Sequence, residues 1–217
     1  MAPNPEVTRQ RLIAAAETLF AERGVEGVSL REINAVAGMR NATALQYHFH
    51  DRYGLVKAIL AKHTPAVDAA RHALLDEYSS AGIDDLRALA AALVRPSAAK
   101  LGDADGGRAY LRIHAQVLNR PEMPVFDESK APPRDSIQRW RSAVGPLLPD
   151  VAVRRLHHRF TAMRVSATEL ARRAAASPRR DDQLFVSHLT DLVASLLATP
   201  VSPETAALLS ARAAPAH

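Results

Sequence analysis

The stretch LQYHFHDRY, residues 45–53, concentrates side chains whose types could bind a metal, a base edge or a phosphate. Tyr47, Phe49 and Tyr53 lie within seven positions of a chain that has five Phe, four Tyr and one Trp, and His48 and His50 lie among them. On a helix the two histidines point about 200° apart, and the chain has no Cys to complete a common zinc set, so we expect no metal site here. The open alternatives are a piece of core and a surface that recognises another molecule.

Placed on a helix that begins near Asn41, a good N-cap residue, the surrounding side chains separate by angle. Ala42, Leu45 and Phe49 fall on one face, and Thr43, Gln46, Tyr47 and His50 fall on the other. The first face can pack against a small core. The second face carries donors and acceptors suited to base edges and phosphates, which makes this short helix a candidate for contact with DNA.

Two helices are expected before it. Apolar residues form one stripe over residues 9–23, and Gly24 supplies a stop. A second, short helix opens at VSLREI, where Ser29 and Glu32 have the spacing of a capping box, and it ends at Gly38. Three short helices with a glycine turn between the second and third follow the helix-turn-helix plan, in which the third helix enters the major groove.

Composition bounds the class of protein. The 217 residues are 47% hydrophobic and 24% charged, as in ordinary globular proteins, and the net charge of +5 favours an anionic partner. Apolar positions repeat at intervals of three and four throughout, without the alternation of a strand, so the expected fold class is all-α. We find neither a secretory signal nor a run long enough to cross a bilayer, and we expect a cytoplasmic protein without contact to a membrane.

The rest of the chain is expected to be helical. Asp51 can cap a fourth helix, which Pro65 kinks or interrupts. Further helices are predicted over residues 83–101, 107–119, 132–147, 150–176, 181–198 and 203–213. The apolar band of 181–198 is wide enough to serve both a core and a partner. Packed against their copies in a second chain, 150–176 and 181–198 would form a four-helix dimer interface. The alternative is that both stripes are only intrachain core.

Residues 5–65 resemble the DNA-binding domain of TetR-type transcriptional regulators. The matching elements are RLIAAAETLFAERGVEGVSLREINAVAG, then QYHF, then HDRYGLVKAIL. The resemblance implies a helix-turn-helix DNA-binding domain over 5–65 and a helical-bundle domain over 66–217 for effector binding and dimerisation. One departure is an additional residue between Gly38 and Phe49, which we place at Met39 or Arg40.

With that placement Asn41 keeps the family's serine cap position. The resemblance then implies DNA contacts from Ala42, Thr43, Gln46, Tyr47 and His48, with Arg52 on a phosphate. Asn41 and Arg40, just before this helix, complete the predicted DNA-binding set, because a cation beside a helix in the groove also meets phosphate. Roles without DNA contact stay open as alternatives: Tyr47 can pack within the domain, Thr43 can extend the cap, and Arg40 can be a solvated turn residue. The amide of Gln46 has the donor and acceptor geometry for the N6/N7 edge of adenine.

The resemblance implies a homodimeric repressor that binds a pseudo-palindromic operator in double-stranded DNA and is released by a small molecule. An activator or a ligand-independent regulator is the alternative, followed by a helical-bundle enzyme or carrier. No catalytic constellation is found, so we expect no enzyme and no cofactor. The effector is not identified. Candidate groups for its pocket are Tyr110, His114, Asn119 and Trp140.

Overall fold

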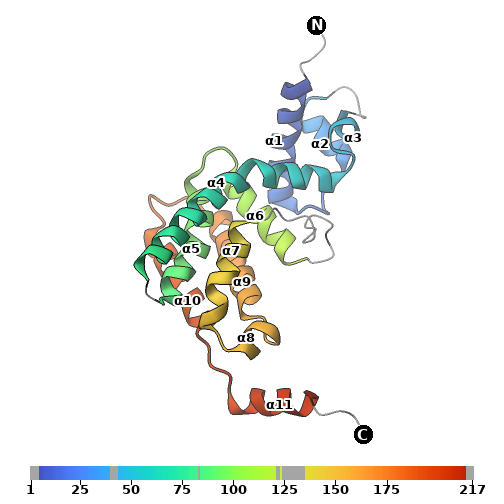
Figure 1. Ribbon diagram of the computed structural model, residues 1–217. Helices are drawn as coiled ribbons and strands as arrows, with labels where there is room; N and C mark the ends of the chain where they lie inside the picture. Colours follow the sequence, from blue (N-terminus) through green and yellow to red (C-terminus); the bar gives the residue numbers. More distant parts are fainter. Residues whose placement is uncertain (1–4, 40–43, 83, 121–122, 124–134, 214–217) are drawn as a thin grey trace.

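The chain is all-α, as predicted. A computed structural model describes residues 5–39, 44–82, 84–120, 123 and 135–213, and these contain no strand. Figure 1 shows the elements in chain order: α1 Pro5–Arg23, α2 Leu30–Val36, α3 Ala44–Phe49, α4 Arg52–Ala81, α5 Leu86–Ala98, the 3₁₀ helix η1 Ala99–Gly102, α6 Gly107–Leu118, α7 Ser136–Val144, the 3₁₀ helix η3 Gly145–Leu147, α8 Asp150–Arg154, α9 His158–Ala175, α10 Gln183–Leu197 and α11 Pro203–Ala213.

Helices α1, α2 and α3 gather around the first half of α4 at one end of the molecule, and we call this group the head (Figure 1). The apolar stripe of α1 turns inward, so that Leu12 and Phe20 are fully buried together with Ile33 of α2 and Leu45 of α3. Gly24 ends α1 with a φ of 83°, a left-handed conformation that costs glycine little. Burial of these side chains removes apolar surface from water and fixes the three helices, of which α2, with seven residues, and α3, with six, are too short to be stable alone.

Helix α4 runs from the head into the rest of the molecule without interruption. The Asp51 carboxylate accepts a hydrogen bond from the Gly54 N–H at 2.8 Å, which confirms the predicted cap, and Gly82 ends the helix with a φ of 62°. Pro65 was predicted to kink or interrupt this helix, and the interruption is wrong, because Pro65 lies inside α4. Proline costs a helix about 3 kcal/mol. Leu60 and Val67 are buried on either side of it, and their packing offsets that cost.

The second half of α4 and helices α5 to α10 form the larger part of the molecule, which we call the body (Figure 1). Trp140 of α7 is fully buried and donates its indole N–H to the Leu89 carbonyl of α5 at 2.8 Å. The prediction of one helix over 150–176 is wrong: α8 ends at Arg154, and α9 begins at His158. His157 between them has a φ of 55°, a left-handed conformation that no helix interior accommodates.

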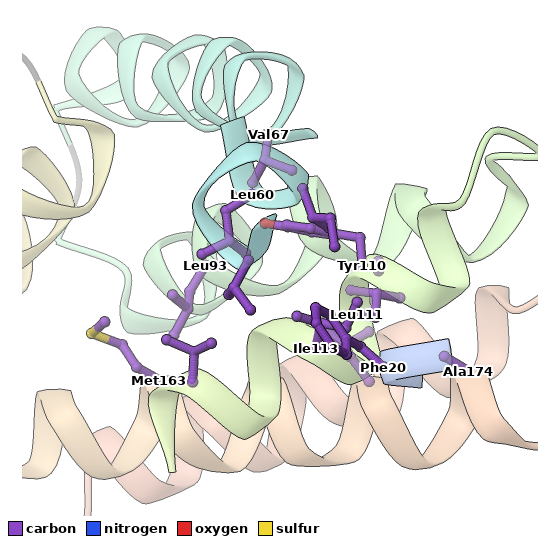
Figure 2. Close-up of a cluster of buried hydrophobic side chains, with 14 of the residues drawn as sticks. Phe20, Leu60, Val67, Leu93, Tyr110, Leu111, Ile113, Met163 and Ala174 are labelled. Atoms are coloured by element: carbon purple, nitrogen blue, oxygen red, sulfur yellow. The ribbon is translucent and has the colours of Figure 1, made fainter. Parts of the chain in front are cut away.

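Head and body share one continuous hydrophobic cluster. Figure 2 shows Phe20 of α1 next to Leu111 and Ile113 of α6, with Ala174 of α9 close by. All four side chains are buried. Because this core does not stop at the end of the head, the head is held against the body by apolar packing as well as by the covalent connection through α4.

Helix α11, predicted over 203–213, lies away from the body at the C-terminal end (Figure 1). In the part of the chain that the structure describes, no helix has the length and apolar character needed to span a membrane.

Candidate nucleic-acid interface

Helix α3 presents two chemically different faces, as its period predicts. Leu45 is fully buried and Phe49 is nearly so, which holds the helix onto α1 and α2. Gln46, Tyr47 and His50 are exposed, and Tyr47 has 81% of its surface open to solvent. On this six-residue helix the Tyr47 ring and hydroxyl are therefore open to contact with another molecule.

The histidine between these faces is partly buried by its neighbours. The His48 ring packs with its edge against Tyr47, with ring centroids 5.1 Å apart, and lies 6.1 Å from Phe49. On the other side of α3, the Arg9 guanidinium of α1 lies 5.6 Å from the centre of the Phe49 ring. His48 is therefore placed between the core side and the exposed side of α3, within reach of the surface that Tyr47 occupies.

The helix that precedes α3 begins at a complete capping box. The Ser29 Oγ accepts from the Glu32 N–H at 3.2 Å, and a Glu32 carboxylate oxygen accepts from the Ser29 N–H at 2.8 Å. Hydrogen bonds from Ser29 and from Arg23 lower the pKa of Glu32 to about 2. This local network confirms the predicted start of α2 and fixes the angle at which α2 leaves the end of α1.

Arg52 lies at the start of α4 and braces the turn between α1 and α2. Its Nη1 donates to the carbonyl oxygens of Val25 at 3.3 Å and Glu26 at 3.2 Å, and to the Glu26 carboxylate at 2.9 Å. Tyr53 donates its hydroxyl to the same carboxylate at 2.8 Å, and this hydrogen bond raises the pKa of Tyr53. The sequence offered no signal for this brace, because Glu26 and Arg52 meet only after the helices pack.

Four of the predicted DNA-contacting residues, Arg40, Asn41, Ala42 and Thr43, lie outside the described residues. Met39 donates its N–H to the Asn34 carbonyl at 2.9 Å and thereby continues the turn that ends α2. The position of the additional residue in this turn stays a prediction. Of the other predicted contacts, Gln46 and Tyr47 share the open face of α3, His48 lies at its edge, and Arg52 lies in the brace at the start of α4.

The candidate effector groups separate into two places. Tyr110 is buried, hydrogen-bonded to Thr64, and stacked between His63 at 4.8 Å and His114 at 5.4 Å. Burial raises the pKa of Tyr110 to about 12 and lowers the pKa of His114 to about 4, the latter with a contribution from the nearby Arg71 charge. Trp140 is also in the core.

Asn119 instead lies near the surface at the end of α6. Its amide group donates to Thr168 at 3.0 Å, and its oxygen accepts from Arg164 at 2.8 Å. The structure therefore does not bring Asn119 together with the buried Tyr110 and the half-buried His114.

A cluster of ionisable groups, buried at Glu17 and His63 and open to solvent at Asp105, joins the head to the body. Glu17 of α1 accepts from Lys62 of α4 at 3.1 Å and lies 2.9 Å from the Nε2 of His63, whose side chain is 2% exposed. Lys62 also donates to Asp105, in the loop that leads into α6, at 2.8 Å. Gly106 in this loop has a φ of 81°, and a Cβ there would lie 2.7 Å from the Glu17 carboxylate. Only glycine fits both the backbone conformation and the close approach.

Gln116 forms a second joint between α6 and the end of α1. Its side-chain oxygen accepts from the Val25 N–H at 3.0 Å, and its side-chain nitrogen donates to the Phe20 carbonyl at 3.3 Å. A side chain of the body thus pairs with two backbone groups, the Phe20 carbonyl and the Val25 N–H, where α1 ends and the turn toward α2 begins. The polar residues of α6 are visible in the sequence, but no sequence pattern places Gln116 against α1.

The exposed face of a short third helix, set on two helices with a capped turn, defines a helix-turn-helix DNA-binding domain. Residues 12–59 match the family model for bacterial regulatory proteins of the tetR family. Over these residues the chain is similar to the DNA-binding domain of tetR-family transcriptional regulators.

Solved structures of similar proteins include a TetR-family regulator from Streptomyces coelicolor A3, with 17% identity over 89% of this chain and 96% of that one, at a TM-score of 0.45. A gamma-butyrolactone receptor, an ArpA-like protein, has 22% identity over 89% and 95% of the two chains, at a TM-score of 0.46. RolR in complex with resorcinol has 21% identity over 93% and 98%, at a TM-score of 0.46. A comparison with curated protein sequences gives no significant match.

Proposed function

We propose that this protein is a homodimeric repressor that binds a pseudo-palindromic operator and releases it when a small-molecule effector binds. The observation that carries the proposal is the open face of α3, where Gln46 and the 81% exposed Tyr47 stand out from a helix anchored by buried Leu45 and Phe49. A helix of this kind can enter the major groove while its apolar face stays in the domain. In this proposal residues 5–65 form the DNA-binding domain and residues 66–217 the regulatory domain.

The proposed DNA contacts come from the exposed side of α3, from the start of α4 and from the segment before α3. Gln46 pairs with a base edge, and Tyr47 and His48 contact the groove or its phosphates. Arg52 contacts a phosphate through Nε or Nη2, since the hydrogen bonds that brace the α1–α2 turn use its Nη1. The segment from Arg40 to Thr43, which precedes α3, supplies the remaining contacts.

The proposed dimer uses α9 and α10. Three large apolar side chains on these helices stay exposed in the single chain: Phe160 at 39%, Leu184 at 83% and Leu192 at 48%. A second copy related by a two-fold axis would bury such a surface and would place two heads on one face of the DNA. Two heads combine their binding energies on a symmetric site, whereas one head makes few contacts.

The proposed release by an effector uses the joints between head and body. Glu17 is tied to Lys62 and, through Lys62, to Asp105, while Gln116 holds the end of α1. A ligand that shifts α6 would therefore move the head, and the two heads of a dimer would leave the spacing of the operator. Release requires the effector to bind the shifted arrangement more tightly than the DNA-bound one. We assign no catalytic residues.

Footprinting on the DNA upstream of the protein's own gene tests the proposal. We expect a protected segment with two-fold symmetry whose protection weakens steeply as the salt concentration rises, because phosphate contacts release counterions. If no salt-sensitive protected segment is found there or upstream of the neighbouring genes, the proposal is wrong.

A further inference from the structure

A groove lies between the end of α1 in the head and helices α6 and α9 in the body. Ala21 and Gly24 line it from the head, Gln116 and Arg112 from α6, and Ala171 from α9. We propose that this α1–α6 groove binds a small carboxylate with an apolar body, and that the bound molecule holds the head in the orientation seen here. This site is separate from the buried Tyr110 and the half-buried His114, and its occupation does not depend on repression or on effector release.

The size and floor of the groove suit a small apolar body. Its volume is about 440 Å³, within the usual range of small-molecule sites, which is roughly 300 to 1,000 Å³. Ala21 and Ala115 are buried in its floor, and Ala171 is half-buried at its side. Short side chains at these three positions leave a hollow where α1, α6 and α9 meet. An aromatic or branched aliphatic group would bury apolar surface against them.

The charges at the groove favour an anion. Arg112 of α6 and Arg120, two residues beyond the end of α6, both line the groove. Among the residues that the structure describes, neither guanidinium has an acidic partner, whereas Arg87, Arg139 and Arg173 of the body each form an ion pair.

One acidic group lines the groove, and a second lies in an adjoining hollow. Glu22 of α1 lines the groove from the head. Glu169 of α9 lines an adjoining hollow that shares Asn119 and Thr168 with the groove, and it is paired with Arg172 at 2.7 Å. Arg164 lines the same hollow. The groove itself therefore carries two arginines and one glutamate, and Arg112, which is half-buried, is the natural partner for a carboxylate.

An occupant of the groove would touch both parts of the protein next to the Gln116 joint. Gln116 already bridges α6 to Val25 and Phe20 at this place. Because one wall belongs to α1 and the other to α6 and α9, the complete groove exists only while the head is docked as seen here. A ligand that contacts both walls binds this arrangement better than any other, and it therefore shifts the population toward it.

The chain has no Cys, so a single introduced thiol reports on the groove without background. In the full-length Ala171→Cys protein, the rate of labelling by a thiol reagent is measured with benzoate, with the neutral isostere benzamide, and without addition. A ligand of this size binds with millimolar affinity, so about 10 mM benzoate should slow labelling at least threefold, by rough estimate, and benzamide should not. An Ala211→Cys protein, labelled on exposed α11, shows whether benzoate affects the reagent itself.

Adding Arg112→Gln to the Ala171→Cys protein separates the proposed site from any other. We expect this change to abolish the benzoate protection and to leave folding intact, since no described side chain pairs with Arg112. Arg155→Gln, at an exposed arginine beyond α8, should leave the protection unchanged. Absence of protection, equal protection by benzamide, or protection that survives Arg112→Gln would each overturn the proposal.

Discussion

At the scale of single residues, the division of α3 into a buried and an exposed face is what the helical period predicts, and the structure confirms it for Leu45, Gln46, Tyr47 and Phe49. The bonding of Arg52 could not be predicted in the same way. Its contact with Glu26 joins residues 26 positions apart, and such a pair becomes visible only when the helices are packed. Local patterns fix the orientation of a side chain on its own helix, while pairing across helices depends on the tertiary structure.

Gln46→Ala tests the assignment of the exposed face. Loss of a bidentate amide contact should reduce discrimination between the preferred base pair and the others by about 1–3 kcal/mol, with little change in binding to random DNA. Competition binding with operator variants measures this. Gln138→Ala, at an exposed glutamine of α7 in the body, is the matched control and should bind as the unchanged protein does. Unaltered base preference in Gln46→Ala would remove Gln46 from the interface.

His114 should make the stability of the protein depend on pH. Its pKa is lowered from 6.5 to about 4 in the fold, so below pH 6.5 the unfolded chain takes up a proton that the folded chain does not. Its contribution to stability is complete above pH 6.5 and falls as the pH drops toward 4. Relative to His114→Gln, the unchanged protein should lose roughly 1–3 kcal/mol between pH 7.5 and 4.5.

Denaturant unfolding at the two pH values measures this difference. The control is His157→Asn, at an exposed histidine whose left-handed backbone asparagine tolerates. Its pH dependence should match that of the unchanged protein. If His114→Gln has the same slope as well, His114 is not held neutral in the fold.

At the scale of elements, the helices with strong local signals were predictable and the breaks between them were less so. The Ser29–Glu32 capping box and the Asp51 cap mark the starts of α2 and α4 within a few residues of sequence. Pro65 was expected to be able to interrupt α4, but burial of the neighbouring residues keeps the helix continuous. The stripe over 150–176 gave no sign of the left-handed His157, because apolar periodicity does not record a backbone reversal.

Gln116→Ala tests the joint between α6 and α1. The change leaves the N–H of the fully buried Val25 without its acceptor, which should lower the free energy of unfolding by about 1–3 kcal/mol. It should also weaken binding to a palindromic site, because a head held less firmly is less often in the required position. Thermal unfolding and gel-shift titration measure the two effects. Gln138→Ala should change stability by less than about 0.5 kcal/mol. A gel-shift titration unchanged by Gln116→Ala would show that the joint does not position the head.

At the scale of the whole molecule, the sequence distinguished a small N-terminal helical unit from a larger helical body, but it did not show that one hydrophobic cluster runs through both. Phe20, which the stripe of α1 marks as core, packs with Leu111 and Ile113 of the body (Figure 2). Contacts between helices that are distant in sequence are invisible to periodicity. Those contacts are what would let a change in the body reach α3.

Leu192→Asp tests the proposed dimer surface. Leu192 is 48% exposed in the single chain, so a charge there should not unfold the protomer, but it would be buried unpaired against a second copy. We expect sedimentation equilibrium to show a monomer, with at least tenfold weaker binding to a palindrome as a rough estimate. Leu208→Asp on α11, at a leucine that is 62% exposed, is the control and should remain a dimer. A dimer in the Leu192→Asp protein would place the interface elsewhere.

The most direct test of DNA recognition by α3 in a dimer is selection of binding sites from random duplex DNA by the full-length protein. We predict an enriched sequence with two-fold symmetry, half-sites a helical turn or more apart, and no enrichment when Gln46 and Tyr47 are both replaced by Ala. Enrichment of an asymmetric site, or of the same site by the doubly substituted protein, would contradict this account.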